Sequence, residues 1–167
     1  KVPGSGTPGG RGWLACDDGS SEKADFLHID TVDGVPSLSL IHVKKSGELS
    51  PGRGISVSDY EVVTGQAVKN VRWVDQAALS GDLAGQLAGR IGNRVWHDGA
   101  PAGAAGFLSA VTSLGANYSR NVVIVQPRVT QATVNAARTA ANGPDYRRLQ
   151  QLDTLLQGAR LSVAAVN

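Results

Sequence analysis

Two stretches near the start of the chain, EKADFLHID at 22–30 and SLSLIHVK at 37–44, determine the expected fold. Apolar and polar residues alternate in both, which is the pattern of β-strands that bury one face. The Asp33-Gly34 dipeptide between them is a strong signal for a tight hairpin turn. We therefore expect two antiparallel neighbouring strands here, with the side chain of His28 directed away from the core.

A helix is expected soon after this hairpin. Glycine and proline make 45–56 a loop. Ser58 lies three residues before Glu61, which is the spacing of a capping box, so it should begin a helix that ends near Ser80-Gly81. The residues with helical spacing that should face the core are Tyr60, Val63, Ala67, Val71, Val74 and Ala78.

The remaining pattern predicts an α/β fold. A short strand at 13–16 should precede the hairpin, and NVVIVQ at 121–126 is typical of a buried strand. The other elements expected from the pattern are helices at 83–91, 107–114, 130–141 and 145–158, a loop at 92–106 and a last strand at 161–166. Strands that first form a meander and then alternate with helices indicate a mixed β-sheet flanked by helices.

Composition limits the class of protein. The 167 residues suit one domain at 13–167, and the Gly-, Pro- and Ser-rich segment 1–12 should be a flexible N-terminal segment or a linker. The net charge of +2 permits nucleic-acid contact without arguing for it. No apolar run approaches the roughly 20 residues of a membrane span, and the single cysteine, Cys16, favours a cytoplasmic setting. The lack of methionine and the expected final strand suggest a fragment of a longer protein.

The residues at the two strand ends suggest a chemistry. Asp25 begins the first strand and Lys44 ends the second, so the two could meet at one end of the sheet. An acid that holds a divalent cation, beside a lysine that stabilises a developing oxyanion, is a phosphodiester-cleaving pair. His42 shares the face of Lys44 and could bind a metal or orient water. Glu22 could supply a second carboxylate. A strand-edge aspartate, a solvated lysine, a structural histidine and a loop glutamate are the alternatives.

The expected helix adds polar groups. Gln66 and Lys69 fall on one helix face, with Trp73 one turn on, and could hold a water or a phosphate. A solvated helix flank is the alternative. A basic rim for DNA could be formed by Lys44, Lys45, Arg53, Lys69 and Arg72.

The ordered set of Asp25, His42-Val43-Lys44 and YEVVTGQAVK at 60–69 resembles the PD-(D/E)XK nuclease superfamily, most of all its restriction-endonuclease-like domains of the Mrr and Holliday-junction-resolvase type. The segments 17–26 and 65–73 are also similar to C-terminal domains of bacterial restriction and defence helicases. The resemblance implies a Mg²⁺- or Mn²⁺-dependent endonuclease of restriction or phage defence. It also implies a metal-binding role for Asp25, and roles for Lys44 and Gln66 in catalysis.

One position departs from the family pattern, because His42 stands where the second acid is usual. Glu61, Glu22 or His42 itself could take that role, or the domain could be inactive and only bind DNA. We favour a site of Asp25 and Lys44 with Glu22 or His42. The expected partners are DNA, a helicase or ATPase in the same longer chain and, for double-strand cutting, a second copy of the chain. A domain that contacts no nucleic acid is the remaining alternative.

Overall fold

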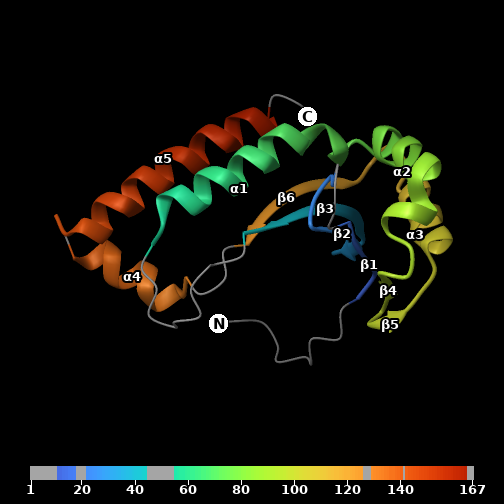
Figure 1. Ribbon diagram of the computed structural model, residues 1–167, viewed down its shortest axis with the longest axis horizontal. Helices are drawn as coiled ribbons and strands as arrows, with labels where there is room; N and C mark the ends of the chain where they lie inside the picture. Colours follow the sequence, from blue (N-terminus) through green and yellow to red (C-terminus); the bar gives the residue numbers. More distant parts are fainter. Residues whose placement is uncertain (1–10, 18–21, 45–54, 126–128, 141, 165–167) are drawn as a thin grey trace. The chain divides into compact units, whose positions relative to one another are not determined.

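The structure is a computed structural model that describes residues 11–17, 22–44, 55–125, 129–140 and 142–164 (Figure 1). The strands in these ranges are β1 (Trp13–Cys16), β2 (Phe26–Val32), β3 (Val35–Val43), β4 (Val95–His97), β5 (Ala100–Pro101) and β6 (Ser119–Val125). The α-helices there are α1 (Val57–Asn70), α2 (Gln76–Arg90), α3 (Ala104–Thr112), α4 (Gln131–Thr139) and α5 (Pro144–Ala164). The strands form one sheet of order β5-β4-β1-β2-β3-β6, so the expected mixed α/β architecture is confirmed.

The chain divides into two compact units. The first unit comprises residues 1–40 and 73–121, and the second comprises 41–72 and 122–167. β3 and β6 contribute residues to both units, whereas α2 and α3 belong to the first and α1, α4 and α5 to the second. None of the helices in the described ranges combines the length and the apolar character needed to cross a membrane.

Both two-residue turns of the sheet are built from Asp-Gly. Asp33 and Gly34 have φ values of 51° and 80°, and they join β2 to β3 as the sequence predicts. Asp98 and Gly99, with φ values of 49° and 81°, join β4 to β5 in the same way. Positive φ at both positions is the geometry of a type I′ turn, which suits the twist of a hairpin. The prediction of a loop at 92–106 is therefore wrong, because a second hairpin and the start of α3 lie there.

The long helix expected to end near Ser80-Gly81 is also corrected. α1 ends at Asn70, a 3₁₀ turn (η1, Val71–Val74) follows, and α2 then runs through Ser80-Gly81. The second helix begins beside Asp75, whose Oδ1 accepts the N–H of Ala78 at 2.8 Å. This bond satisfies one of the N-terminal backbone N–H groups that have no hydrogen-bond partner within the helix.

The start of α1 also differs from the expected capping box. The helix begins at Val57 with Ser56 as its N-cap, and no side-chain hydrogen bond caps it. Ser58 is already helical. Of the expected apolar stripe, Val63 and Ala67 are buried on α1. Val71 and Val74 are buried in η1, Tyr60 is half-buried and Ala78 is exposed.

Two predictions for the end of the chain are corrected. The strand expected at 121–126 is β6, which starts earlier and lies at an edge of the sheet. Its Val123 and Val125 are 38% and 39% exposed, so this strand is not buried. The helix expected to stop at Gly158 continues to Ala164, so the described part of 161–166 is helical rather than a strand. Apolar β-branched residues alone did not distinguish an edge strand from a central one.

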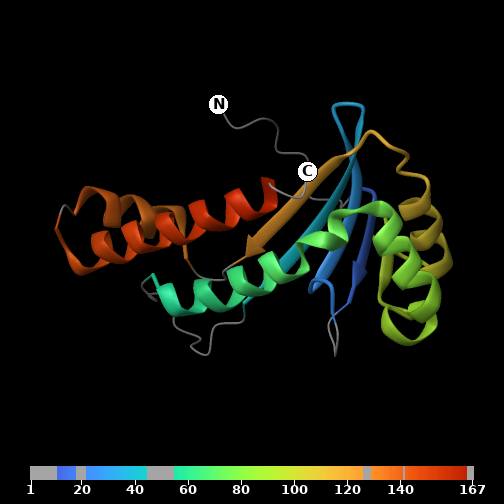
Figure 2. The same cartoon turned by 90° about the horizontal axis from the view of Figure 1, so that it is seen from above.

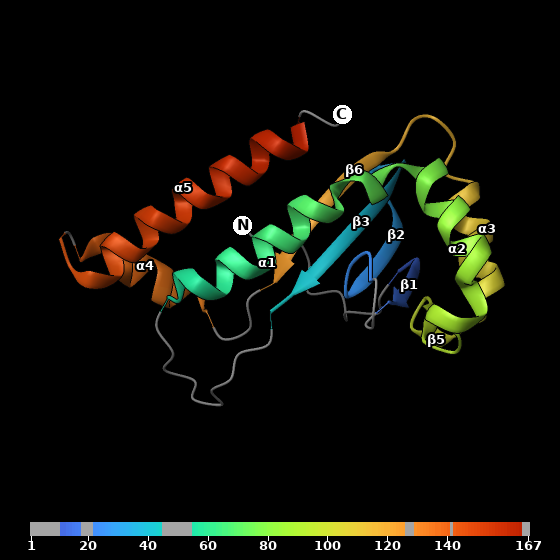
Figure 3. The ribbon, with the colours of Figure 1, turned by 45° about the horizontal axis from the view of Figure 1, so that its top comes forward.

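Each unit has its own apolar contacts. In the first unit α2 packs against α3, and α3 packs against β1 (Figure 3). The ring of Trp13 lies against Gly106 of α3, where a Cβ atom would collide with it. In the second unit α1 packs against α5 (Figure 2). A buried cluster there comprises Ile55, Ala137, Leu149 and Leu152.

A buried tyrosine fixes the start of α2 within the first unit. The Tyr118 hydroxyl donates to the carbonyl oxygen of Val74 at 2.7 Å and accepts the N–H of Gln76 at 2.8 Å. Tyr118 is only 7% exposed. The phenol therefore satisfies two backbone groups at the break between η1 and α2.

We expect the substitution Tyr118→Phe to lower the free energy of unfolding by about 1–3 kcal/mol, since it leaves buried backbone groups without a partner. Urea unfolding followed by circular dichroism measures this change. Tyr146→Phe is the matched control, because the Tyr146 hydroxyl only accepts a long, exposed bond from Gln150 at 3.4 Å. Equal stability of the two variants would contradict the role given to Tyr118.

Candidate functional site

The first part of the predicted site is the short segment 22–25, which leads into β2. Glu22 and Asp25 are both half-buried there. Two bonds hold this segment to the end of β1: the N–H of Lys23 donates to Asp17 Oδ2 at 2.9 Å, and the N–H of Asp17 donates to the carbonyl oxygen of Asp25 at 3.1 Å. The backbone that carries both predicted acids is therefore fixed by Asp17.

Asp17 in turn belongs to a largely buried charge cluster, which we call the Arg90 network: Asp17, Lys23, Asp82 and Arg90. The guanidinium of Arg90 makes a two-bond contact with the Asp17 carboxylate, with Nε to Oδ1 at 3.0 Å and Nη2 to Oδ2. Its Nη1 donates to Asp82 Oδ2 at 2.6 Å, and Lys23 Nζ lies 3.1 Å from Asp82 Oδ1. Two cations thus balance two anions, and the Asp17 side chain is only 2% exposed.

The Lys23 ammonium also lies over an aromatic ring. Its Nζ is 4.0 Å from the centroid of the Trp73 ring, which is cation–π geometry. The helical spacing of the sequence predicts instead that Trp73 lies one turn from Gln66 and Lys69. The sequence does not predict that Lys23 is buried. The one signal for its burial was its position between Glu22 and Ala24, just before a strand.

The second part of the predicted site lies at the end of β3. His42 is buried, at 2% exposure, and burial alternates along the strand so that it shares a face with Leu38 and Leu40. Lys44 directly follows the strand and is half-buried. Its N–H donates to the carbonyl oxygen of Val125 at 3.1 Å, which holds the backbone of this residue against the end of β6.

The polar residues expected on the helix are found on α1 and η1. Gln66, Lys69 and Arg72 are exposed, which leaves them accessible to a ligand or to solvent. Glu61, the other acid considered, is exposed as well. Two further members of the basic rim, Lys45 and Arg53, lie outside the described residues.

Two other groups on α1 are more enclosed. The Thr64 hydroxyl is buried, and its Oγ1 has no hydrogen-bond partner within the described part of the chain. Burial raises the pKa of the Tyr60 phenol above its usual value. The sequence predicts only that Tyr60 faces the core, and it does not single out Thr64.

The predicted site residues are divided between the units. Glu22 and Asp25 belong to the first unit, and the second unit contains His42, Lys44, Gln66, Lys69 and Arg72. The meeting of Asp25 with Lys44 therefore stays a prediction.

The donor set of the 22–25 segment suits a hard cation. Across the described ranges, no group of three or more His, Cys, Asp or Glu side chains forms a metal cluster. Mg²⁺ does not require one, because it retains several waters and is commonly held by one or two carboxylates together with substrate phosphates. The carboxylates of Glu22 and Asp25 are oxygen donors of this kind. The buried imidazole of His42 is less suited to a hydrated ion.

No protein family, curated protein or solved structure matches the chain.

The Arg90 network yields a stability prediction. We expect Arg90→Met to lower the free energy of unfolding by about 3–5 kcal/mol, because it leaves the buried Asp17 carboxylate without its cation. Thermal and urea unfolding measure the loss.

Arg120→Met is the control within the same unit. Arg120 is exposed, and its guanidinium lies 4.3 Å from the Tyr118 ring centroid, so this change should cost less than about 1 kcal/mol. The double variant Asp17→Asn with Arg90→Met should lose less free energy of unfolding than the two single variants lose in sum, since it removes both charges. Strict additivity would show that the two side chains act independently.

Proposed function

We propose that this chain is a metal-dependent DNA endonuclease of the PD-(D/E)XK type, with a restriction-endonuclease-like fold, that acts in restriction or phage defence in the cytoplasm. The observation that supports it is the position of two residues on one hairpin. Asp25 immediately precedes β2, Lys44 immediately follows β3, and these strands are sheet neighbours joined by a two-residue turn. The superfamily pattern places its acid and its lysine at such strand ends.

In the proposed reaction, Asp25 and Glu22 would hold a Mg²⁺ or Mn²⁺ ion through carboxylate oxygens. The bound ion would supply Lewis-acid activation of water and phosphate. Lys44 stabilises the negative charge that develops on the phosphate, or assists removal of a proton from the attacking water. Gln66 positions water or the DNA backbone, and Lys69 and Arg72 contact phosphates.

The second candidate is an inactive nuclease fold that binds DNA and is attached to a helicase. One observation favours it: His42, at the usual position of the second acid, is a buried imidazole and not an accessible carboxylate. In this case the basic side chains keep their role while the acids of 22–25 do not act in catalysis.

Cleavage assays test the first candidate. With Mg²⁺ or Mn²⁺, the chain should cut supercoiled, linear or branched DNA, and Asp25→Ala or Lys44→Ala should lower the rate at least about 100-fold, since each removes a group that acts on the transition state. Asp153→Ala and Arg147→Ala are the charge-matched controls, because both residues are exposed on α5. An Asp25→Ala protein that cuts as fast as the parent would exclude this mechanism.

Salt dependence tests the second candidate. If the chain binds DNA without cutting it under any metal, its affinity should fall steeply between about 50 and 200 mM salt. Replacing Lys69 or Arg72 by Gln should reduce the slope of log K against log salt by about 1 for each phosphate contact removed. An affinity that does not respond to salt would argue against phosphate contacts and against both candidates.

A further inference from the structure

The side chains of β1 divide between two faces of the first unit's sheet. Trp13 faces α3, where its ring lies against Gly106, and it stacks on His97 with ring centroids 4.3 Å apart. Because side chains alternate along a strand, Leu14 faces the opposite side. The strand register places Leu14 directly opposite His28 of β2 and Trp96 of β4.

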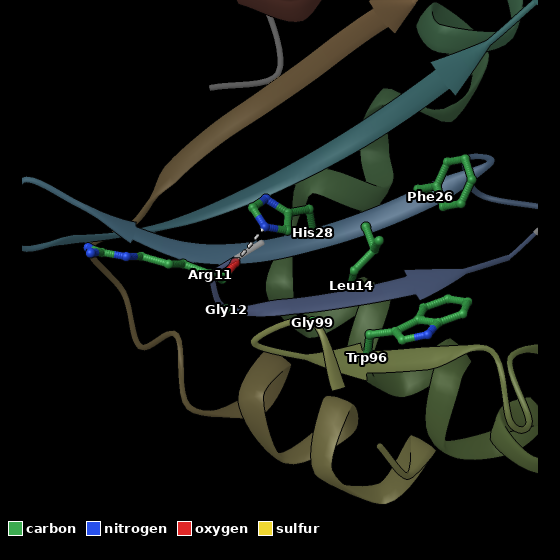
Figure 4. Close-up of a pocket in the computed structure, with 7 residues that line it drawn as sticks. All are labelled: Arg11, Gly12, Leu14, Phe26, His28, Trp96 and Gly99. Atoms are coloured by element: carbon green, nitrogen blue, oxygen red, sulfur yellow. Dashed lines mark hydrogen bonds between the residues drawn. The ribbon is translucent and has the colours of Figure 1, made fainter. Parts of the chain in front are cut away.

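These residues line a pocket of about 330 Å³ (Figure 4). We call this cavity the Trp96 pocket. The residues that line it are Arg11, Gly12, Leu14, Phe26, His28, Trp96 and Gly99. Three of these side chains are flat rings. Figure 4 shows Leu14 between the rings of β2 and the indole of Trp96. The pocket is near the small end of the range of roughly 300–1,000 Å³ that is usual for small-ligand sites.

Hydrogen bonds hold one side of the pocket in place. Asp98 Oδ1 accepts the N–H of Gly12 at 2.7 Å, and the N–H of Asp98 donates to the Gly12 carbonyl oxygen at 2.9 Å. The carbonyl oxygen of Arg11 lies 3.0 Å from His28 Nε2. Gly12 has a φ of +79°, and a Cβ atom there would collide with the backbone of Ile29, so only glycine fits. The pocket is therefore formed before a ligand arrives.

The position of the pocket in the sheet restricts what it can bind. β1 is hydrogen-bonded to β4 on one side and to β2 on the other. An extended peptide recognised by strand addition needs a free sheet edge, which this strand does not offer. A ligand at the Trp96 pocket meets side-chain faces instead, and flat aromatic faces favour a flat ligand.

We infer that the Trp96 pocket binds an unpaired nucleobase of a DNA strand, an inference that rests on the proposed action on DNA. Aromatic side chains on a sheet face are a common stacking surface for exposed bases. Among the residues that the structure describes, the lining contains the cation Arg11 and no carboxylate, which suits the phosphates next to a bound base. Asp98 lies beside the pocket with Oδ1 engaged by Gly12. Stacking therefore provides most of the affinity, and phosphate contact adds less.

His28 gives the pocket a chemical preference. A backbone carbonyl only accepts hydrogen bonds, so His28 Nε2 must donate to Arg11. The neutral ring then presents Nδ1 as an acceptor. The cytosine amino group and the thymine N3–H can both donate to this nitrogen, whereas N3-methylthymine has no N–H to donate. Thymine should therefore bind more tightly than N3-methylthymine.

The test is a titration of the whole chain in EDTA with fluorescently labelled single strands. A strand of deoxycytidines should bind at least about tenfold more tightly than a strand of the same length that carries abasic sites. Trp96→Ala or Phe26→Ala should weaken binding about 5- to 150-fold, since stacking is lost. Val32→Ala, an exposed position on the same hairpin, should leave binding unchanged. Equal binding of the abasic strand would overturn the inference.

A second measurement needs no variant that could misfold. In the parent protein, the indole N–H resonance of Trp96 should shift when the deoxycytidine strand is added, with Trp96→Phe used only to assign that resonance. At pH 8, deoxythymidine should bind about 2- to 10-fold more tightly than N3-methyldeoxythymidine, and His28→Phe should remove this preference. A Trp96 resonance that an aromatic peptide shifts and DNA does not would assign the pocket to a protein partner and overturn the inference.

The result is independent of catalysis, because EDTA removes the metal and no strand is cut. If the chain binds DNA in a base-dependent way but does not cleave it in Mg²⁺, the proposed catalysis fails and this inference stands. If the chain cleaves DNA but its affinity does not depend on the bases, only this inference fails.

Discussion

The guanidinium of Arg90 neutralises carboxylates from two separate parts of the first unit, and both the burial of Asp17 and the position of the segment 22–25 depend on this contact. A buried charge is costly unless it is paired and hydrogen-bonded. Asp17 could not stay buried at the end of β1 without its cation. Asp17 in turn accepts from the backbone of Lys23 and donates to that of Asp25. The position of the predicted metal-binding acid is thus set by a residue at the end of α2.

The two candidate sites of the first unit are supported differently. The segment 22–25 is held by ionic contacts within the Arg90 network, whose charges balance. The Trp96 pocket is held by the Asp98-Gly99 turn and by the bond between His28 and Arg11. Because different residues support them, the pocket and the acids can be altered separately. Each of the two could therefore be changed without unfolding the other.

The sequence predicted the β2–β3 hairpin because Asp33-Gly34 lies between two long alternating runs. The same dipeptide at 98–99 was overlooked, since its strands have three and two residues and are surrounded by glycine. The break at η1 was hidden because the apolar stripe continues through it. The residues of the candidate site were predicted from their order along the chain. The Arg90–Asp17 contact was not, because it joins positions 73 residues apart that no periodicity links.

The division into units has a practical meaning for dissecting the protein. Each unit is assembled from two separate segments, and the chain passes between them at 40–41, 72–73 and 121–122. A single truncation therefore cannot liberate either half intact, and it would also cut through β3 or β6 if made at the first or last crossing. Loss of activity in a deletion variant would therefore reflect unfolding and not the function of the deleted unit. A circularly permuted or split-and-rejoined polypeptide would keep the two segments of one unit together.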